Sequence, residues 1–274
     1  MRSAVRVISF KLAIITTGDD LLSEDKPLFT PKDFIRYVAR QRDVSEAFFN
    51  VPNRLILVYQ RLGFEHAKSF LNGKDKEWLY KERPIHVGEL DHVRIGVFRP
   101  WGGAPAAAAV LEELIACGAN KIIEVGFAGG LQPSLKLGDI VVVTKAISGE
   151  GTSRYYFPHE LEFYPSSDLT NLLVQELKQK RIKYFVGPVW TTDAFYRETK
   201  GRLLKLQQQG VMAVNCETSA LFAVARYRRT KITSIQVISD IRTEEGYKFA
   251  FEDQRVIDML KKSIEIAIQT LTKI

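Results

Sequence analysis

The order in which apolar strands and helical segments follow one another constrains the fold of this chain more than any other feature. Segments of about ten to fifteen residues with helical periodicity separate most of the short apolar stretches. This alternation predicts an α/β fold whose mixed, mostly parallel sheet is covered by helices. The expected strands are residues 55–59, 85–90, 93–98, 121–125, 140–148, 184–190, 212–215 and 232–239. The expected helices begin near Thr30, Glu65, Pro105, Asp168, Lys200, Glu217 and Glu252.

The chain divides into an N-terminal extension, residues 1–52, and a single main domain, residues 53–274. An apolar opening at residues 4–18 precedes Thr30-Pro31, which supplies helix N-cap and N1 signals. We expect the extension to pack on the main domain and to add an edge strand.

Composition excludes several classes of protein. The chain is 46% hydrophobic and 26% charged, as an ordinary globular protein is. Its net charge of +7 is modest, and the basic clusters lie near expected helix ends, so a nucleic-acid partner is not predicted. The opening carries Arg6 and Lys11 and no stretch reaches membrane-spanning length, so we expect no membrane partner and a cytoplasmic location.

Neither cysteines nor histidines indicate a metal or cofactor. Cys117 and Cys216 lie in apolar helical contexts without CxxC spacing. The four histidines lack metal-ligand spacing. The sequence therefore predicts no metal and no cofactor.

Two acids stand where they suit cleavage of an N-glycosidic bond. Glu217 begins a helix and Asp240 ends a strand at the edge of the sheet where α/β proteins bind ligands. That reaction needs a group that holds the sugar hydroxyls and a group that relieves the departing base of negative charge. A carboxylate suits the first task and a carboxyl the second.

A strand that runs into a glycine turn forms a second informative stretch, EVGFAGGLQPSLKLGDIVV at residues 124–142. Gly126 lies in this turn, and glycine lets a ligand approach the backbone closely. The spacing is neither that of a dinucleotide site nor that of a P-loop.

Together, the segments WGGAPAA, EVGFAGGLQPSLKLGDIVV, VWTTDAFYRET, MAVNCETSALFAVA and VISD resemble the nucleoside phosphorylase superfamily, over about residues 53–270. That family includes purine nucleoside, uridine and methylthioadenosine phosphorylases and related nucleosidases. The resemblance implies one α/β domain with a barrel-like sheet centre, cleavage of a nucleoside, and phosphate as co-substrate. It also implies a homodimer or a homohexamer with active sites near subunit contacts.

The sugar and base residues of the family pattern have counterparts here. Glu217 matches the glutamate that holds the ribose hydroxyls, although Asn215 and Cys216 stand where Glu and Met are usual. Asp240 matches the acid of purine-cleaving members, so the resemblance favours purines over uridine. Phe195 matches an aromatic residue that stacks on the base.

The phosphate residues do not match. Gln60-Arg61-Leu62 replaces Gly-Asp-Pro, and Phe64 stands near the position of the first phosphate-binding arginine. Glu124 occupies the position of a second arginine, and Phe127 replaces a threonine that follows it. The cations that could substitute are Arg61, Arg99 and Arg242.

Two alternatives to phosphorolysis follow. In a nucleosidase, water replaces phosphate, and Glu124 or Glu65 would accept its proton. Glu124 could instead pair with a lysine or arginine and serve only structure. The second alternative is a non-catalytic protein that binds nucleosides.

Overall fold

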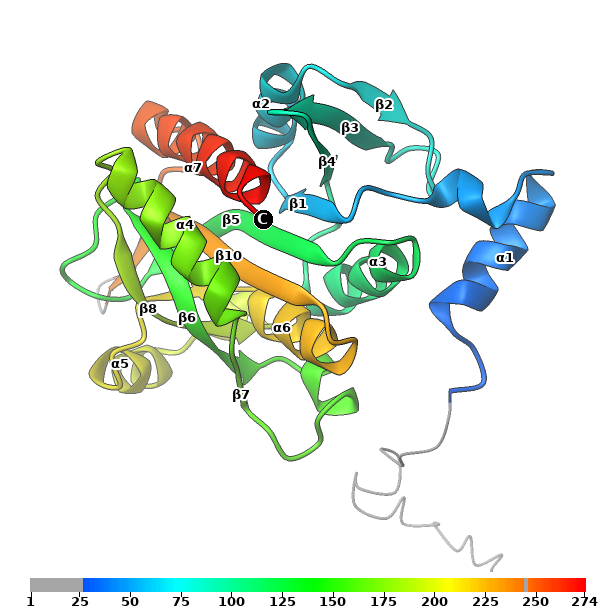
Figure 1. The fold of residues 1–274 in the computed structure, drawn as a ribbon. Coiled ribbons are helices and arrows are strands. Elements are labelled where there is room, and N and C mark those ends of the chain that lie inside the picture. Colours follow the sequence, from blue (N-terminus) through cyan, green and yellow to red (C-terminus); the bar gives the residue numbers. More distant parts are fainter. Residues whose placement is uncertain (1–26, 244–245) are drawn as a thin grey trace, which may run out of the picture.

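The computed structural model describes residues 27–243 and 246–274 (Figure 1). Its strands are β1 (Arg54–Val58), β2 (Lys74–Lys76), β3 (Ile85–Leu90), β4 (Val93–Phe98), β5 (Lys121–Gly130), β6 (Ile140–Gly149), β7 (Glu162–Phe163), β8 (Phe185–Thr192), β9 (Ala213–Asn215), β10 (Lys231–Thr243) and β11 (Gly246–Phe249). The α-helices are α1 (Pro31–Gln41), α2 (Arg61–Leu71), α3 (Ala104–Ala116), α4 (Ser167–Gln179), α5 (Lys200–Gln208), α6 (Thr218–Tyr227) and α7 (Gln254–Thr272). Three short 3₁₀ helices are η2 (Glu46–Phe49), η3 (Thr152–Tyr155) and η4 (Phe195–Arg197).

Five strands of the sheet close into a ring. β10 pairs with β5 in parallel and with β6 antiparallel. From β6 the ring continues in parallel to β8 and β9, and β9 returns antiparallel to β5. β1 extends the sheet from β5, and β4, β3 and β2 follow it. The predicted α/β fold, with a mixed sheet and a barrel-like centre, is therefore confirmed.

Alternating side chains of the strands build two cores on opposite faces of the sheet. In β1, Leu55 and Leu57 are buried in the core that contains α3 and α6. The intervening Ile56 and Val58 belong to the core that contains α2, α4 and α7. Figure 1 shows α4 and α7 lying side by side over the second face, and the two helices are in contact.

Several elements differ in length from the sequence expectation. α2 begins at Arg61 rather than near Glu65, and α7 at Gln254 rather than near Glu252. β5 and β10 continue to Gly130 and Thr243, past the apolar runs that predicted them. The extension of β5 pairs with β10 through residues 126–130, which apart from Phe127 are glycine or alanine and let the two backbones stay together. The last part of β5 is therefore rich in glycine, whereas that of β10 carries the polar residues Ser239, Asp240 and Arg242.

The helical part of the N-terminal extension packs on the main domain. Thr30 and Asp33 form a capping box at the start of α1. Ile35 and Ala39 of this helix are buried in the core that contains α3. The apolar opening and its predicted edge strand fall outside the described residues, and the division at residue 52 stays a prediction.

None of the helices in these described ranges is both long and apolar enough to pass through a membrane.

Candidate active site

A pocket of about 180 Å³ lies at the carboxyl ends of three parallel strands, β1, β5 and β10. Ligand crevices of α/β proteins occur at this edge of the sheet. The loops before α3 and α6 close the pocket from another side. Its lining residues are Tyr59, Gln60, Gly102, Phe127, Gly129, Phe195, Glu198, Val214, Asn215, Cys216, Glu217, Ser239, Asp240, Arg242 and Phe251.

Glu217 is the N-cap residue of α6, and two backbone amides hold its carboxylate. The N–H of Gly103 donates to Oε1 at 2.8 Å, and the N–H of Cys216 donates to Oε2 at 3.2 Å. Gly103 caps α3 with a φ of 95°, a conformation that favours glycine. Burial raises the pKa of Glu217, and the two amide bonds oppose that rise. The side chain is thus fixed at the junction of two helix N-termini.

A β-bulge in β10 places Asp240. The pairing of β10 with β5 shifts register between Ile238 and Asp240, so Asp240 lies opposite Gly129. Ser239 Oγ donates to Asp240 Oδ1 at 2.9 Å, and Arg242 Nη1 lies 2.7 Å from Oδ2. Burial raises the pKa of Asp240, while Arg242 and Ser239 act to lower it.

Ion pairs and aromatic rings hold the Arg242 side chain in place inside the pocket; this arrangement is called the clamp on Arg242. Its Nε lies 2.5 Å from Glu198 Oε2, and its guanidinium stacks 5.1 Å from the ring centroid of Phe195 and 5.5 Å from that of Tyr247. A Cβ atom on Gly129 would lie 1.1 Å from Arg242 Nη1. Only glycine at position 129 therefore leaves room for the guanidinium.

Glu124 lies in β5 beneath the pocket and is not among the lining residues. Its side chain is fully buried. Thr218 Oγ1 donates to Oε2 at 2.7 Å, and the Tyr59 hydroxyl donates to Oε1 at 3.4 Å. Burial, and secondly the nearby Glu217, raise the pKa of Glu124 to about 7. Among the residues described, the partners of this carboxylate are hydroxyl groups rather than a lysine or arginine.

Of the other residues that the sequence predicted for the site, some line the pocket and others lie outside it. Asn215, Cys216 and Phe127 line the pocket, and burial raises the pKa of the Cys216 thiol to about 12. Gly126 faces Gln236 instead of the cavity. Arg61, Arg99 and Glu65 do not line the pocket; Arg61 and Glu65 are exposed on α2, and Arg99 is partly buried.

The sequence analysis did not single out several pocket residues, among them Tyr59, Gly129, Glu198 and Phe251. Tyr59 follows β1 directly, so its place at the strand's carboxyl end was a usable signal. Glu198 follows Phe195 by three residues and is recognisable only through its ion pair with Arg242. Gly129 lies where the sequence predicted a glycine turn; the structure instead continues β5 through Gly130, and the role of Gly129 depends on the same arginine. Phe251 follows the described strand β11, which the sequence did not predict.

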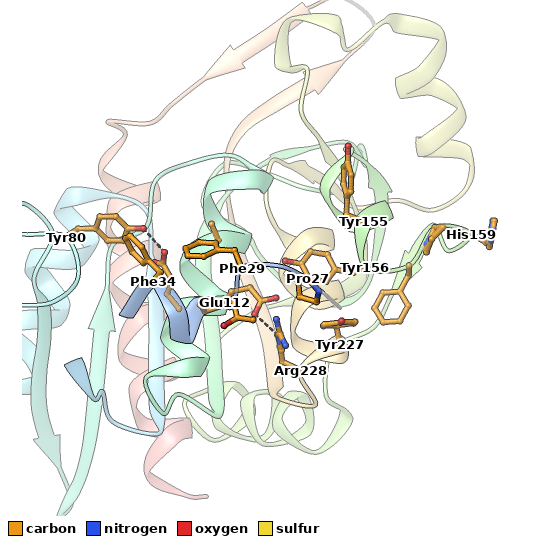
Figure 2. A pocket seen from close by; sticks show the side chains of 16 residues that line it. Pro27, Phe29, Phe34, Tyr80, Glu112, Tyr155, Tyr156, His159, Tyr227 and Arg228 are labelled. Carbon is orange, nitrogen blue, oxygen red and sulfur yellow. Dashed lines mark hydrogen bonds and ion pairs between the residues drawn. The ribbon is translucent and has the colours of Figure 1, made fainter. Parts of the chain in front are cut away.

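A larger pocket, of about 1220 Å³, lies between the start of α1, α3, η3 and the end of α6 (Figure 2). Aromatic rings dominate it, among them Phe29, Tyr156 and Tyr227. Tyr80 donates to Glu113 Oε1 at 2.8 Å, and Arg228 pairs with Glu112 at 2.6 Å. Since none of the predicted site residues lines this pocket, we place the candidate active site in the smaller one.

No cluster of histidine, cysteine, aspartate and glutamate within residues 27–243 and 246–274 has the arrangement of a metal site.

Comparison with known proteins identifies the family. The sequence profile of the phosphorylase superfamily matches residues 59–273. The chain belongs to the phosphorylase superfamily. This confirms the resemblance that the motifs indicated.

Curated relatives carry names of several phosphorylases. The chain is 30% identical to a guanosine phosphorylase of Halorubrum lacusprofundi over 61% of this chain and 69% of the relative. It is 29% identical to a DeoD-type purine nucleoside phosphorylase of Shewanella oneidensis, over 69% and 79% of the two chains. A uridine phosphorylase of Treponema pallidum is 27% identical, over 70% and 77%.

The fold is also that of a solved phosphorylase. The uridine phosphorylase of Vibrio fischeri ES114 superposes with a TM-score of 0.73 at 25% identity. The match covers 82% of this chain and 93% of that structure.

Proposed function

We propose that this member of the phosphorylase superfamily cleaves the N-glycosidic bond of a purine nucleoside, with phosphate as the co-substrate. The observation that carries the proposal is the convergence of Glu217, Asp240 and Phe195 on one pocket from three separate segments. Relatives named as guanosine and purine nucleoside phosphorylases support the purine assignment. Uridine remains the alternative base, because other relatives are named uridine phosphorylases.

The two carboxyl groups suit different halves of the substrate. Glu217, held by the amides of Gly103 and Cys216, would accept hydrogen bonds from the ribose hydroxyls. Asp240, with its raised pKa, is suited to donate a proton or hydrogen bond to the departing base. A base stacked on Phe195 would share that ring with the guanidinium of Arg242. Binding therefore places the base beside both charged groups.

Hydrolysis is the second candidate, and the charge of the pocket favours it. Arg242 is the only cation among the described lining residues, and it is paired with Asp240 and Glu198. Phe64 and Glu124 stand near the positions of the family's phosphate-binding arginines, and neither lines the pocket. Phosphate therefore lacks an attraction of about 4 kcal/mol, the energy of two opposite unit charges about 4 Å apart at an effective dielectric constant of 20. Water carries no such penalty.

A nucleoside panel tests the proposal. Adenosine, guanosine, inosine, uridine and 5′-methylthioadenosine are incubated with the protein with and without phosphate, and free base is measured by chromatography. Base release that requires phosphate, together with a sugar 1-phosphate product, supports phosphorolysis. Equal release in phosphate-free buffer refutes phosphorolysis and supports hydrolysis. Binding without release over a wide pH range would leave only a nucleoside-binding protein.

The remaining expectations accompany this proposal. We propose a homodimer or homohexamer in the cytoplasm that needs no cofactor. Light scattering on the purified protein measures the assembly, and a metal-chelated sample with undiminished activity would support the absence of a cofactor.

A further inference from the structure

The surroundings of Glu124 are unusual for a buried carboxyl group. In the β5 register it lies opposite Leu57 of β1 and Ser234 of β10. The hydroxyls of Thr218, Ser234 and Tyr59 all bond to it. Its titratable neighbours include Tyr59 and Glu217, and the largest contributions to its pKa shift come from burial, Glu217 and the three hydroxyls. A charge at this position would be compensated only by hydroxyl dipoles.

The same hydroxyls connect Glu124 to the turn that carries Glu217. Asn215 Nδ2 donates to Thr218 Oγ1, and Thr191 Oγ1 donates to Asn215 Oδ1 at 2.9 Å. Asn215 and Thr218 lie on either side of Glu217 in the chain. Glu124 thus anchors, through Thr218, a buried chain of hydrogen bonds that spans the turn between β9 and α6. Glu217 lies within this turn, so the chain links Glu124 to the segment that carries Glu217.

Electrostatic interaction is a second link between Glu124 and Glu217. Glu217 is the second largest cause of the raised pKa of Glu124, after burial, so the two carboxyl groups interact. Tyr59 is on the pocket wall and interacts electrostatically with Glu124, Glu217 and Cys216. Two ionised carboxylates in this buried space would repel one another. A neutral Glu124 removes this repulsion, and the amides of Gly103 and Cys216 that bond to Glu217 favour its ionised form.

We propose that Glu124 is a positioning residue, a neutral acid that fixes Thr218 and Tyr59 and lets Glu217 carry the negative charge that binds the ribose. Ionisation of Glu124 therefore weakens binding of the ribose, which raises KM, and leaves the rate of the chemical step nearly unchanged. This inference rests on the proposed function, because it assigns the ribose to Glu217. It also gives a physical role to a glutamate at a position where the family resemblance leads one to expect arginine.

The test measures KM and kcat for the best purine nucleoside of the panel between pH 5.5 and 8.5. In the unchanged protein we expect KM to rise about tenfold above pH 7, with kcat changing less than threefold. Glu124→Gln mimics the neutral acid, so its KM should stay low and flat. Glu113→Gln is the matched control, because Glu113 is also buried, accepts a tyrosine hydroxyl and has its pKa raised to about 7. The KM of Glu113→Gln should show the same pH dependence as the KM of the unchanged protein.

A second pair of variants keeps the test independent of how Glu124→Gln folds. Thr218→Val removes the hydroxyl that joins Glu124 to the turn, and we expect KM at pH 6 to rise about tenfold with little change in kcat. Thr233→Val is its control, since Thr233 is a fully buried threonine whose hydroxyl bonds to Thr170, outside the pocket. Its KM should not change.

The outcomes separate this inference from the proposed function. A KM for Glu124→Gln that keeps the pH dependence of the unchanged protein overturns the positioning role while nucleoside cleavage stands. A loss confined to kcat in Thr218→Val overturns it as well. If calorimetry detects no nucleoside binding and the panel shows no release, the proposed function fails and this inference fails with it.

Discussion

At the scale of single residues, the candidate site depends on side chains whose neighbours make them unusual. Asp240 and Arg242 are separated by two positions on one strand, so they face the same side of the sheet and meet over Gly129. The sequence pointed to Asp240 and Arg242 separately. Their ion pair, and the glycine that makes room for it, depend on pairing between strands that are far apart in sequence. Residue types alone therefore suggest that Asp240 and Arg242 belong to the site, but they do not predict the ion pair between them.

Replacing Asp240 tests the acid role. Asp240→Asn keeps the size of the side chain but cannot donate an acidic proton, so we expect kcat for purine nucleosides to fall by about 10²-fold or more. Steady-state kinetics measure the change. Asp258→Asn, at an exposed position on α7, is the control and should leave kcat unchanged. A rate for Asp240→Asn equal to that of the unchanged protein would remove Asp240 from the mechanism.

Replacing Gly129 tests the clamp on Arg242. A methyl group there collides with Nη1, so Gly129→Ala must displace the guanidinium and break its pairing with Asp240. We expect at least a tenfold loss of kcat/KM and a loss of stability of about 1–3 kcal/mol. Gly201→Ala, in α5 with open space around it, should gain up to about 1 kcal/mol in urea unfolding. Normal activity in Gly129→Ala would contradict the clamp.

At the scale of elements, apolar periodicity predicted most strands and helices because the same residues form the two cores. It failed where polar residues continue a strand. The last residues of β10 include Asp240 and Arg242, which are stable in a buried strand because they pair with each other and with Glu198. No local pattern reveals such compensation, since Glu198 comes from a different segment. The pocket lies in this part of the sheet, so the site was harder to predict than the fold.

The start of α1 offers a prediction at this scale. Thr30 caps the helix through its side chain, while Thr199 occupies the N-cap of α5 without a side-chain hydrogen bond. Thr30→Ala should therefore lower the free energy of unfolding by about 1 kcal/mol. Thr199→Ala should change it by only a few tenths. Urea denaturation of both variants measures the difference, and equal effects would show that the capping box contributes nothing beyond the residue type.

At the scale of the whole molecule, several buried carboxyl groups have raised pKa values. Burial raises the pKa of five of them: Glu113, Glu124, Glu198, Glu217 and Asp240. The carboxyl groups with lowered pKa values are mostly exposed and hydrogen-bonded: Asp33, Asp75, Glu162 and Asp168. The first set binds extra protons in the folded state. Four of those five line the pocket or adjoin it, so acid chemistry is concentrated where the substrate would bind.

This distribution fixes how stability depends on pH. A carboxyl group whose pKa is raised by folding binds more protons when folded, so its stabilising contribution is complete below pH 4.5 and is lost as pH rises to about 7. At about 1.4 kcal/mol per pKa unit, Glu124 and Glu113 each account for about 3 kcal/mol of that loss. We therefore expect the free energy of unfolding to fall between pH 4.5 and 7. Guanidinium denaturation at several pH values measures the slope.

Three variants show which carboxyl groups cause the decline in the free energy of unfolding between pH 4.5 and 7. Glu124→Gln and Glu113→Gln remove one titrating group each, so each should flatten the decline by a similar amount. Glu89→Gln, on an exposed part of β3, should leave the slope as it is in the unchanged chain. If Glu124→Gln instead left the slope unchanged, Glu124 would have to be ionised in the folded protein as it is in the unfolded chain. The neutral Glu124 on which the ribose site depends would then be excluded.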